Sequence, residues 1–180
     1  DYSRETFDAV LDVARGIAET HFAPHQKKND VEEPQFIDGT AVIIPEVKEA
    51  FAAVADAGLL AATHDHAIGG MQLPHVIASA VIVHFDAANV GSASYALLTT
   101  GAANLIAAFG SAEQKAIFLP PMFAGRFSGT MALTEPEAGS SLADVRTSAV
   151  PAGDGTYRIT GTKIWISGGD QNMTENIVHM

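Results

Sequence analysis

The sequence predicts an α+β fold in which a helical region gives way to an antiparallel β region near residue 125. Before this point the apolar residues recur every three or four positions, which is the period of a half-buried helix. After Gly125 the β-prone runs are short and are separated by turn residues such as Gly153 and Gly155. With 180 residues, 47% of them apolar, the chain can bury a substantial core.

Two helices are expected in the first sixty residues. Ser3 suits an N-cap, and the apolar residues that follow it share one helical face: Phe7, Val10, Leu11, Ala14, Ile17 and Ala18. A polar link is expected from Pro24 to Pro34. Pro45 then suits the first turn of a second helix, and Gly58 is placed to end it.

Three more helices are expected before the β region. The segment from His75 to Asn89 is apolar almost all round, which predicts a helix buried at the centre of a bundle. Another helix is expected from about Ser92 to Phe109. A capping box of Ser111 and Gln114 opens the last helix, which is expected to end before Pro120 and Pro121.

Four short strands are expected after Gly125, namely Phe127–Leu133, Val145–Val150, Tyr157–Thr160 and Lys163–Ser167. The sequence starts with Asp1 rather than Met, and it stops inside the strand-like apolar run Ile177–Met180. We therefore interpret it as a fragment of a longer protein.

Composition excludes several classes of function. A net charge of −11 argues against nucleic acid binding, which needs clustered Lys and Arg. The absence of cysteine excludes disulfides, thiolate metal sites and cysteine nucleophiles, and fits a reducing, cytoplasmic location. No membrane span is expected, because His84, Asp86 and Asn89 interrupt the best apolar run before it reaches about 18 to 20 residues.

The first candidate site is the segment Met131–Ser141. A strand delivers Thr134, Pro136 turns the chain, and Gly139 and Ser140 offer backbone amides beside a hydroxyl. Several N–H donors and a close backbone approach are what a pyrophosphate needs. Taken alone, the segment is more typical of an ordinary Pro-Gly turn with a capping serine.

The second candidate site is the segment Gly161–Gly169. Alternation along a strand is expected to put Trp165 and Ser167 on one face, and Ile164 and Ile166 on the other. An indole and a hydroxyl two residues apart can lie along a planar heterocycle. An isolated tryptophan, in contrast, usually fills a core.

Together the two segments resemble the acyl-CoA dehydrogenase family. The resemblance covers the whole chain and includes the helical first part, the capped helix with Glu113-Gln114-Lys115, the signature Ala-Leu-Thr-Glu-Pro-x-Ala-Gly-Ser and the block Gly-x-Lys-x-Trp-Ile-Ser. It implies an N-terminal helical domain over 1–125 and, over 126–180, the beginning of a middle antiparallel β-barrel domain. A C-terminal helical domain is absent. The tail from Ser167 to His179 is similar to the methylmercaptopropionyl-CoA dehydrogenase-like branch.

The resemblance implies FAD as cofactor and a set of residues that contact it: Met131, Leu133, Thr134, Gly139, Ser140, Trp165, Ile166 and Ser167. Trp165 would shield the isoalloxazine, and Ser167, where the family commonly has threonine, would bond to the N5 side. Ser140 would lie by the phosphates and also touch the CoA part of the substrate. The sequence departs from the family at Ser141, where an acidic residue is usual, and at Asp144, where a small residue is usual.

By resemblance, the intact enzyme would oxidise an acyl-CoA thioester to the enoyl-CoA and pass electrons from FAD to an electron-transfer flavoprotein, as a homodimer or homotetramer. A glutamate of the C-terminal domain would be the base, so no catalytic residue and no metal site are assigned in this chain. Glu135 and Glu137 are interpreted as loop polarity. Three alternatives stay open: an acyl-CoA or nitroalkane-type oxidase, a non-catalytic flavin-binding homologue and a helical interaction domain.

The histidines receive structural interpretations. His21 and His25 are interpreted as a surface pair, because Pro24 lies between them and no acidic third ligand is evident. The segment 64–66 is interpreted as a solvated loop, and His84 as a hydrogen-bonded core residue. No G-x-G-x-x-G or Walker motif is present, so nicotinamide and P-loop functions are not supported.

Overall fold

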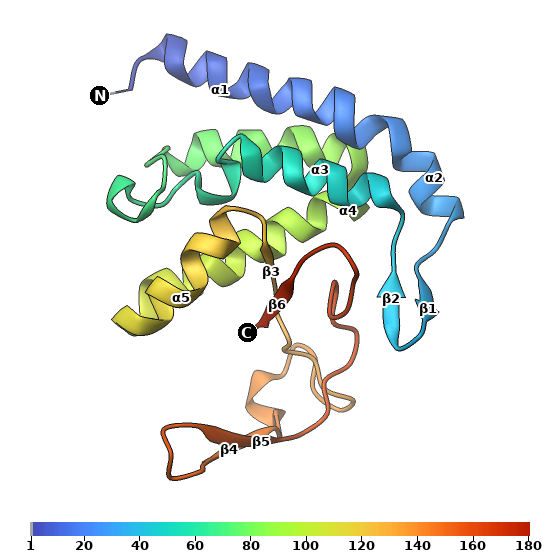
Figure 1. Cartoon of the computed structure of the whole chain (residues 1–180), viewed down its shortest axis with the longest axis vertical. Helices are drawn as coiled ribbons and strands as arrows, with labels where there is room; N and C mark the ends of the chain where they lie inside the picture. The colour runs from blue at the N-terminus through green and yellow to red at the C-terminus, as the bar shows by residue number, and fades with distance from the viewer. Residues whose placement is uncertain (1) are drawn as a thin grey trace.

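The computed structural model describes residues 2–180, and its first half is a layer of helices (Figure 1). Ser3 caps α1 (Arg4–Ile17) as predicted, since its side chain accepts a hydrogen bond from the Thr6 amide at 3.3 Å. The predicted link from Pro24 to Pro34 is wrong over most of its length. The chain stays helical through η1 (Ala18–Phe22), η2 (Ala23–His25) and α2 (Gln26–Val31), because Pro24 falls in the first turn of η2, where its missing N–H costs nothing.

A β-hairpin that the sequence analysis did not predict follows these helices. Strands β1 (Gln35–Ile37) and β2 (Thr40–Val42) pair antiparallel around a turn at Asp38 and Gly39, both in the left-handed region. The helix α3 (Pro45–Asp56) begins at Pro45 as predicted and ends before Gly58, whose φ of 74° suits glycine. Two 3₁₀ turns, η3 (Leu59–Ala61) and η4 (His66–Ile68), lead to the next helix.

The long helix α4 (His75–Phe109) carries the break that the sequence predicted, since Asn89 interrupts it with φ −166° and ψ 89°. The part before Asn89 is not buried all round, however: Val76 and Val83 are 73% and 63% exposed. Among the described helices, α4 is long and apolar enough to cross a membrane by length and composition alone, a property that core helices share. The absence of a membrane span therefore stays a prediction.

The helix α5 (Ala112–Phe123) opens with the predicted capping box, in which the Ser111 hydroxyl and the Gln114 side chain each bond the other residue's amide. The prediction that it ends before Pro120 is wrong, because Pro120 and Pro121 both lie inside the helix. Burial of Leu119 and Met122, which are 2% and 0% exposed, outweighs the loss of two amide donors.

The change from helix to strand lies between Phe123 and Phe127, as the sequence predicts. Strand β3 (Phe127–Thr130) pairs in parallel with β6 (Asn176–His179) and packs on α4, where a Cβ at Gly129 would meet Ala102 at 2.5 Å. Strands β4 (Ser148–Pro151) and β5 (Tyr157–Thr160) form an antiparallel hairpin, and η5 (Leu142–Asp144) precedes it. The domain boundary at residue 125 itself stays a prediction.

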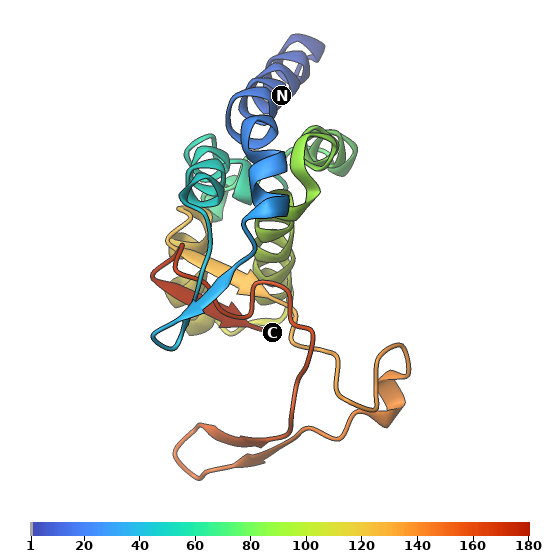
Figure 2. The same cartoon turned by 90° about the vertical axis from the view of Figure 1, so that its right-hand side faces the viewer.

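The fold class is confirmed, although the strands of residues 2–180 form three two-stranded sheets and no closed barrel. The hairpin β4–β5 projects from the helical body, and the two motif segments lie between it and the body (Figure 2). The predicted strand Lys163–Ser167 is wrong, because this segment is irregular. A left-handed backbone at Trp165 interrupts it.

Three of the histidine interpretations are corrected. His25 is not on the surface: it is 3% exposed and bonds the Ser92 hydroxyl at 2.7 Å. His64 is also buried, against the Phe123 ring, so burial lowers the pKa of both imidazoles. His84, predicted in the core, is only half-buried. The described residues contain no cluster of three His, Cys, Asp or Glu suited to a metal ion.

Candidate functional site

The structure brings together the two segments that stood out in the sequence. The Ile164 amide donates to the Thr134 carbonyl at 3.0 Å. The Lys163 ammonium donates to the Leu133 carbonyl at 3.0 Å and pairs with the Glu135 carboxylate at 2.9 Å. Residues about thirty positions apart therefore form one unit, and this contact places Trp165 directly after the residues that touch the first segment.

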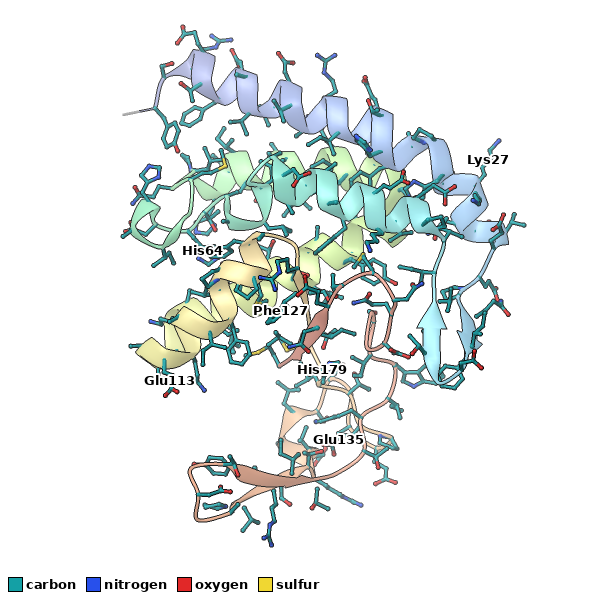
Figure 3. All side chains as sticks on the ribbon, in the orientation of Figure 1. Lys27, His64, Glu113, Phe127, Glu135 and His179 are labelled. Atoms are coloured by element: carbon teal, nitrogen blue, oxygen red, sulfur yellow. The ribbon has the colours of Figure 1, made fainter. Side chains whose placement is uncertain are left out.

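Glu135 is the centre of this unit, so its interpretation as loop polarity is wrong. Its side chain is 7% exposed and accepts hydrogen bonds from the amides of Arg146 at 2.7 Å and Thr147 at 3.0 Å, in addition to the Lys163 contact (Figure 3). Three segments of the β region, around Glu135, around Arg146 and Thr147, and around Lys163, thus meet at one carboxylate. One feature of the sequence could have indicated this pairing. Lys163 is the only basic residue of Gly161–Gly169, and a lysine that becomes buried in a fold is usually paired with an acidic side chain.

The donors around Glu135 hold it in the charged form. The Thr147 side chain, the Arg146 amide and the Lys163 ammonium lower the pKa of Glu135 to about 2, against an ordinary value of 4.5. The amide of Thr147 makes the well-formed contact, whereas its hydroxyl lies buried nearby without hydrogen-bond geometry. A carboxylate of this kind organises a loop and does not accept a proton near neutral pH.

Replacing Glu135 by glutamine is expected to loosen the β region and to change its acid sensitivity. Because the folded-state pKa lies below the unfolded-state value, the carboxylate stabilises the fold above about pH 4.5, and this contribution disappears as the pH falls towards about 2. Urea unfolding between pH 2 and pH 7 should show a weaker loss of stability at low pH in Glu135→Gln than in the wild type, and the remaining loss reflects other carboxylates of lowered pKa such as Glu46 and Glu175. Glu137→Gln, at an exposed ion pair with Arg146, is the matched control and should behave as wild type.

Trp165 does not lie on a strand, so the predicted alternation with Ser167 is not the reason for their placement. Its φ is 58°, a left-handed conformation that is rare for a bulky residue, and its side chain is 86% exposed. The fold therefore holds a large aromatic ring in water on a strained backbone. Strained backbones of this kind cluster at ligand sites, and an exposed indole becomes stable when a ligand covers it.

The two joined segments also carry exposed apolar side chains and hydroxyls besides the indole. Met131 and Leu133 are 42% and 40% exposed, and Thr134 is half-buried between the two segments. Ser167 is exposed in a turn that the Gly169 amide closes onto the Ile166 carbonyl at 3.1 Å. The turn requires glycine next, because Gly168 has φ 64° and lies against the Tyr95 ring. An apolar platform bordered by hydroxyls suits a flat heterocycle.

The loop after Thr134 offers free donors. Glu135 and Ala138 close a tight turn through paired backbone hydrogen bonds, and Gly139 and Ser140 follow it on the surface. Within residues 2–180 the amides of Gly139, Ser140 and Ser141 donate no hydrogen bond. A Cβ at Gly139 would meet no atom within 4 Å, so this glycine leaves room for a ligand rather than for packing. Neighbouring free amides of this kind suit a diphosphate.

Comparison with known proteins gives a consistent picture. The model of the family described as "Acyl-CoA dehydrogenase, N-terminal domain" matches residues 4–126. The chain is 41% identical to 3-methylmercaptopropionyl-CoA dehydrogenase of Ruegeria pomeroyi, over 88% of this chain and 27% of that protein. It is 36% identical to a butyryl-CoA dehydrogenase of Syntrophomonas wolfei, over 99% of this chain and 30% of that protein.

Solved structures agree with this likeness. Glutaryl-CoA dehydrogenase from Mycobacterium smegmatis has a TM-score of 0.75 and 30% identity, covering 92% of this chain and 40% of that one. An acyl-CoA dehydrogenase from Bacillus anthracis, complexed with FAD, has a TM-score of 0.76 and 26% identity, covering 92% of this chain and 27% of that one. The chain thus spans less than a third of the length of the two curated relatives above. The family match over residues 4–126 and the 41% identity show that this chain belongs to the acyl-CoA dehydrogenase family.

Proposed function

We propose that this chain supplies the FAD-contacting face of an enzyme that oxidises an acyl-CoA thioester to its α,β-enoyl-CoA. The observation that carries the proposal is the exposed, left-handed Trp165, tied by the Lys163–Glu135 pair to the segment that presents Leu133 and Thr134. When bound, FAD would supply the acceptor for the hydride that the substrate β-carbon loses. Loss of the α-proton to a base completes the new double bond.

The residues of this chain bind and orient in that reaction. Trp165 covers one side of the flavin and, with Ile166, Met131 and Leu133, keeps water from it. The hydroxyls of Thr134 and Ser167 would donate hydrogen bonds to the polar edge of the ring, with Ser167 on the N5 side by family resemblance.

The free amides of Gly139 and Ser140 would bind the diphosphate of the cofactor. By family resemblance Ser140 would also contact the CoA part of the substrate, and its exposure leaves it accessible for that contact. We propose these assignments on the family resemblance of the loop and on the donors that it leaves free.

No carboxylate of the two motifs suits the role of base. Glu135 is fully engaged and has a pKa of about 2, and Glu137 pairs with Arg146 at 2.9 Å. A general base needs a pKa near the working pH. We therefore place the base, a glutamate by family resemblance, in the part of the full-length enzyme that this sequence does not include.

The 180-residue chain alone is accordingly expected to show no measurable dehydrogenase turnover, at least ~100-fold below the full-length enzyme, because it lacks a general base. The measurement is a dye-coupled assay with both proteins at equal flavin content. Turnover of the short chain at a rate comparable with the full-length enzyme would show that a base lies within these residues.

The substrate is an acyl-CoA, and the names of the relatives make butyryl-CoA and 3-methylmercaptopropionyl-CoA the first two to test. We propose an electron-transfer flavoprotein as acceptor, a homodimer or homotetramer as assembly, a cytoplasmic location, and no nucleic acid or membrane partner. The family resemblance supports the first two of these, and the acidic, cysteine-free sequence supports the cytoplasmic location and the absence of nucleic acid.

The test of this function uses the purified full-length enzyme under anaerobic conditions. It should carry a yellow chromophore that is bleached on addition of one of the two acyl-CoA thioesters and is restored by an electron-transfer flavoprotein. A colourless protein, or a flavin that neither thioester bleaches, would contradict the proposal. Rapid restoration of the colour by air would instead identify an oxidase of the same fold.

A further inference from the structure

A second polar network lies directly after Ser167, in the segment Gly168–Thr174. This segment contains no helix or strand, so side chains must hold its shape. Its residues alternate between two environments: Asp170 and Asn172 are exposed, whereas Gln171 and Met173 are 5% and 4% exposed. The segment is therefore anchored on both of its sides.

The outer side is anchored to the hairpin β1–β2 and the residue that follows it. The Asp170 carboxylate accepts a hydrogen bond from the Ala41 amide at 2.7 Å, and the Asn172 side-chain oxygen accepts one from the Ile43 amide at 3.2 Å. This explains why the hairpin lies beside the red segment that leads into β6 (Figure 1). The inner side depends on one residue.

That residue is Gln171, whose amide group uses all of its hydrogen-bonding positions. Its side-chain oxygen accepts from the amides of Met173 and Thr174, the latter at 3.0 Å. Its side-chain nitrogen donates to the Ser128 hydroxyl at 3.1 Å and to the Thr174 hydroxyl at 2.6 Å. Because Ser128 lies on β3 and is 2% exposed, Gln171 ties the segment to the strand that packs on α4.

We infer that Gln171 is a positioning residue that fixes the Ser167 hydroxyl for hydride transfer without touching the cofactor. The inference rests on the proposed function. Ser167 lies in the turn Ile166–Gly169. The Ile164–Thr134 hydrogen bond holds the chain just before this turn, and Gln171 holds it two residues after the turn. Without Gln171 the amides of Met173, which is buried, and Thr174, which is half-buried, lose their acceptor, so the segment rearranges and the turn moves with it.

Small displacements are costly at such a site, since a misplacement of about 1 Å can slow a reaction ~100-fold. In the full-length FAD-loaded enzyme, Gln171→Met keeps the length of the side chain and removes its polar atoms. We expect it to slow flavin reduction at saturating substrate about 10-fold. Gln171→Glu keeps the oxygens that the two amides need, and the Ser128 hydroxyl can rotate to donate, while the Thr174 hydroxyl already donates to the Asn176 carbonyl, so it should restore part of the rate.

A matched control removes a buried hydrogen bond elsewhere. Ser92 is 3% exposed and bonds His25 at 2.7 Å within the helical layer, so Ser92→Ala should lower stability without slowing flavin reduction. The decisive comparison is a double-mutant cycle with Ser167→Ala. If Gln171 acts through the Ser167 hydroxyl, Gln171→Met should slow flavin reduction in the wild-type background and have no further effect in Ser167→Ala.

The outcomes separate this inference from the function on which it rests. Equal slowing by Gln171→Met in both backgrounds, or slowing by Ser92→Ala as large as that by Gln171→Met, would overturn the positioning role and leave the flavin site intact. A normal rate in Gln171→Met while Ser167→Ala is slow would do the same. A normal rate in Ser167→Ala would remove the proposed flavin contact, and the inference with it.

Discussion

Replacing Trp165 by alanine is expected to weaken FAD binding by roughly 10- to 100-fold, because stacking of a flat heterocycle on an aromatic side chain contributes about 1–3 kcal/mol. The fold itself should hold, since the indole is 86% exposed and contributes little to the core. Equilibrium titration of the flavin-free full-length protein with FAD measures the effect, and urea unfolding of the flavin-free form checks the fold.

Phe109→Ala is the control for Trp165→Ala. Phe109 is also 86% exposed, but it lies at the end of α4 and belongs to neither motif. Its removal should leave FAD affinity unchanged, and Trp165→Phe should retain most of the affinity. Loss of affinity in both alanine variants would mean that exposed aromatic surface matters in general, and the assignment of Trp165 would be wrong.

Replacing Ser167 by alanine is expected to slow flavin reduction about 10- to 100-fold, because a donor aimed at developing charge is worth more in the transition state than in the ground state. The cost in stability should be no more than ~1 kcal/mol, since Ser167 is exposed and lies in a turn closed by backbone atoms. Stopped-flow reduction by saturating acyl-CoA separates the chemical step from binding.

Ser167→Thr keeps the hydroxyl and should reduce at close to the wild-type rate. Ser148→Ala removes an exposed hydroxyl from β4, outside both motifs, and should have no effect. If Ser167→Ala lowered FAD affinity without changing the rate of flavin reduction, the Ser167 hydroxyl would contribute to cofactor binding and not to the transition state of hydride transfer.

Local chemistry explains which parts of the fold were predictable. Ser3, Pro45, Gly58 and the capping box at Ser111 act within one helical turn, so their effect is visible in the sequence, and the structure confirms each. Strand Tyr157–Thr160 was predicted with its exact bounds for the same reason, because turn residues flank it closely. The helix through Pro120 was missed because its cause is distant, in the core under Leu119 and Met122.

The sequence predicted which residues belong to the candidate site, but it did not predict how the backbone arranges them. The motifs identified Trp165 and Ser167, but the expected strand was wrong, since a left-handed residue between Ile164 and Ile166 depends on contacts made by Lys163 with a segment thirty positions away. Glu135 was misinterpreted for a similar reason: three of its partners lie eleven, twelve and twenty-eight positions along the chain. The spacing of residues along the sequence does not reveal that one carboxylate accepts hydrogen bonds from such distant positions.

The central claim is that the flavin lies against Trp165, and the fluorescence of this residue tests it most directly. Trp165 is the only tryptophan of the 180-residue chain, so the intrinsic emission reports on this one position. Titration of the flavin-free 180-residue chain with FAD should quench the emission in a saturable manner. The quenching should rise in parallel with the amount of flavin that stays with the protein on gel filtration. Retention of flavin with unchanged Trp165 emission would place the cofactor elsewhere and contradict the account.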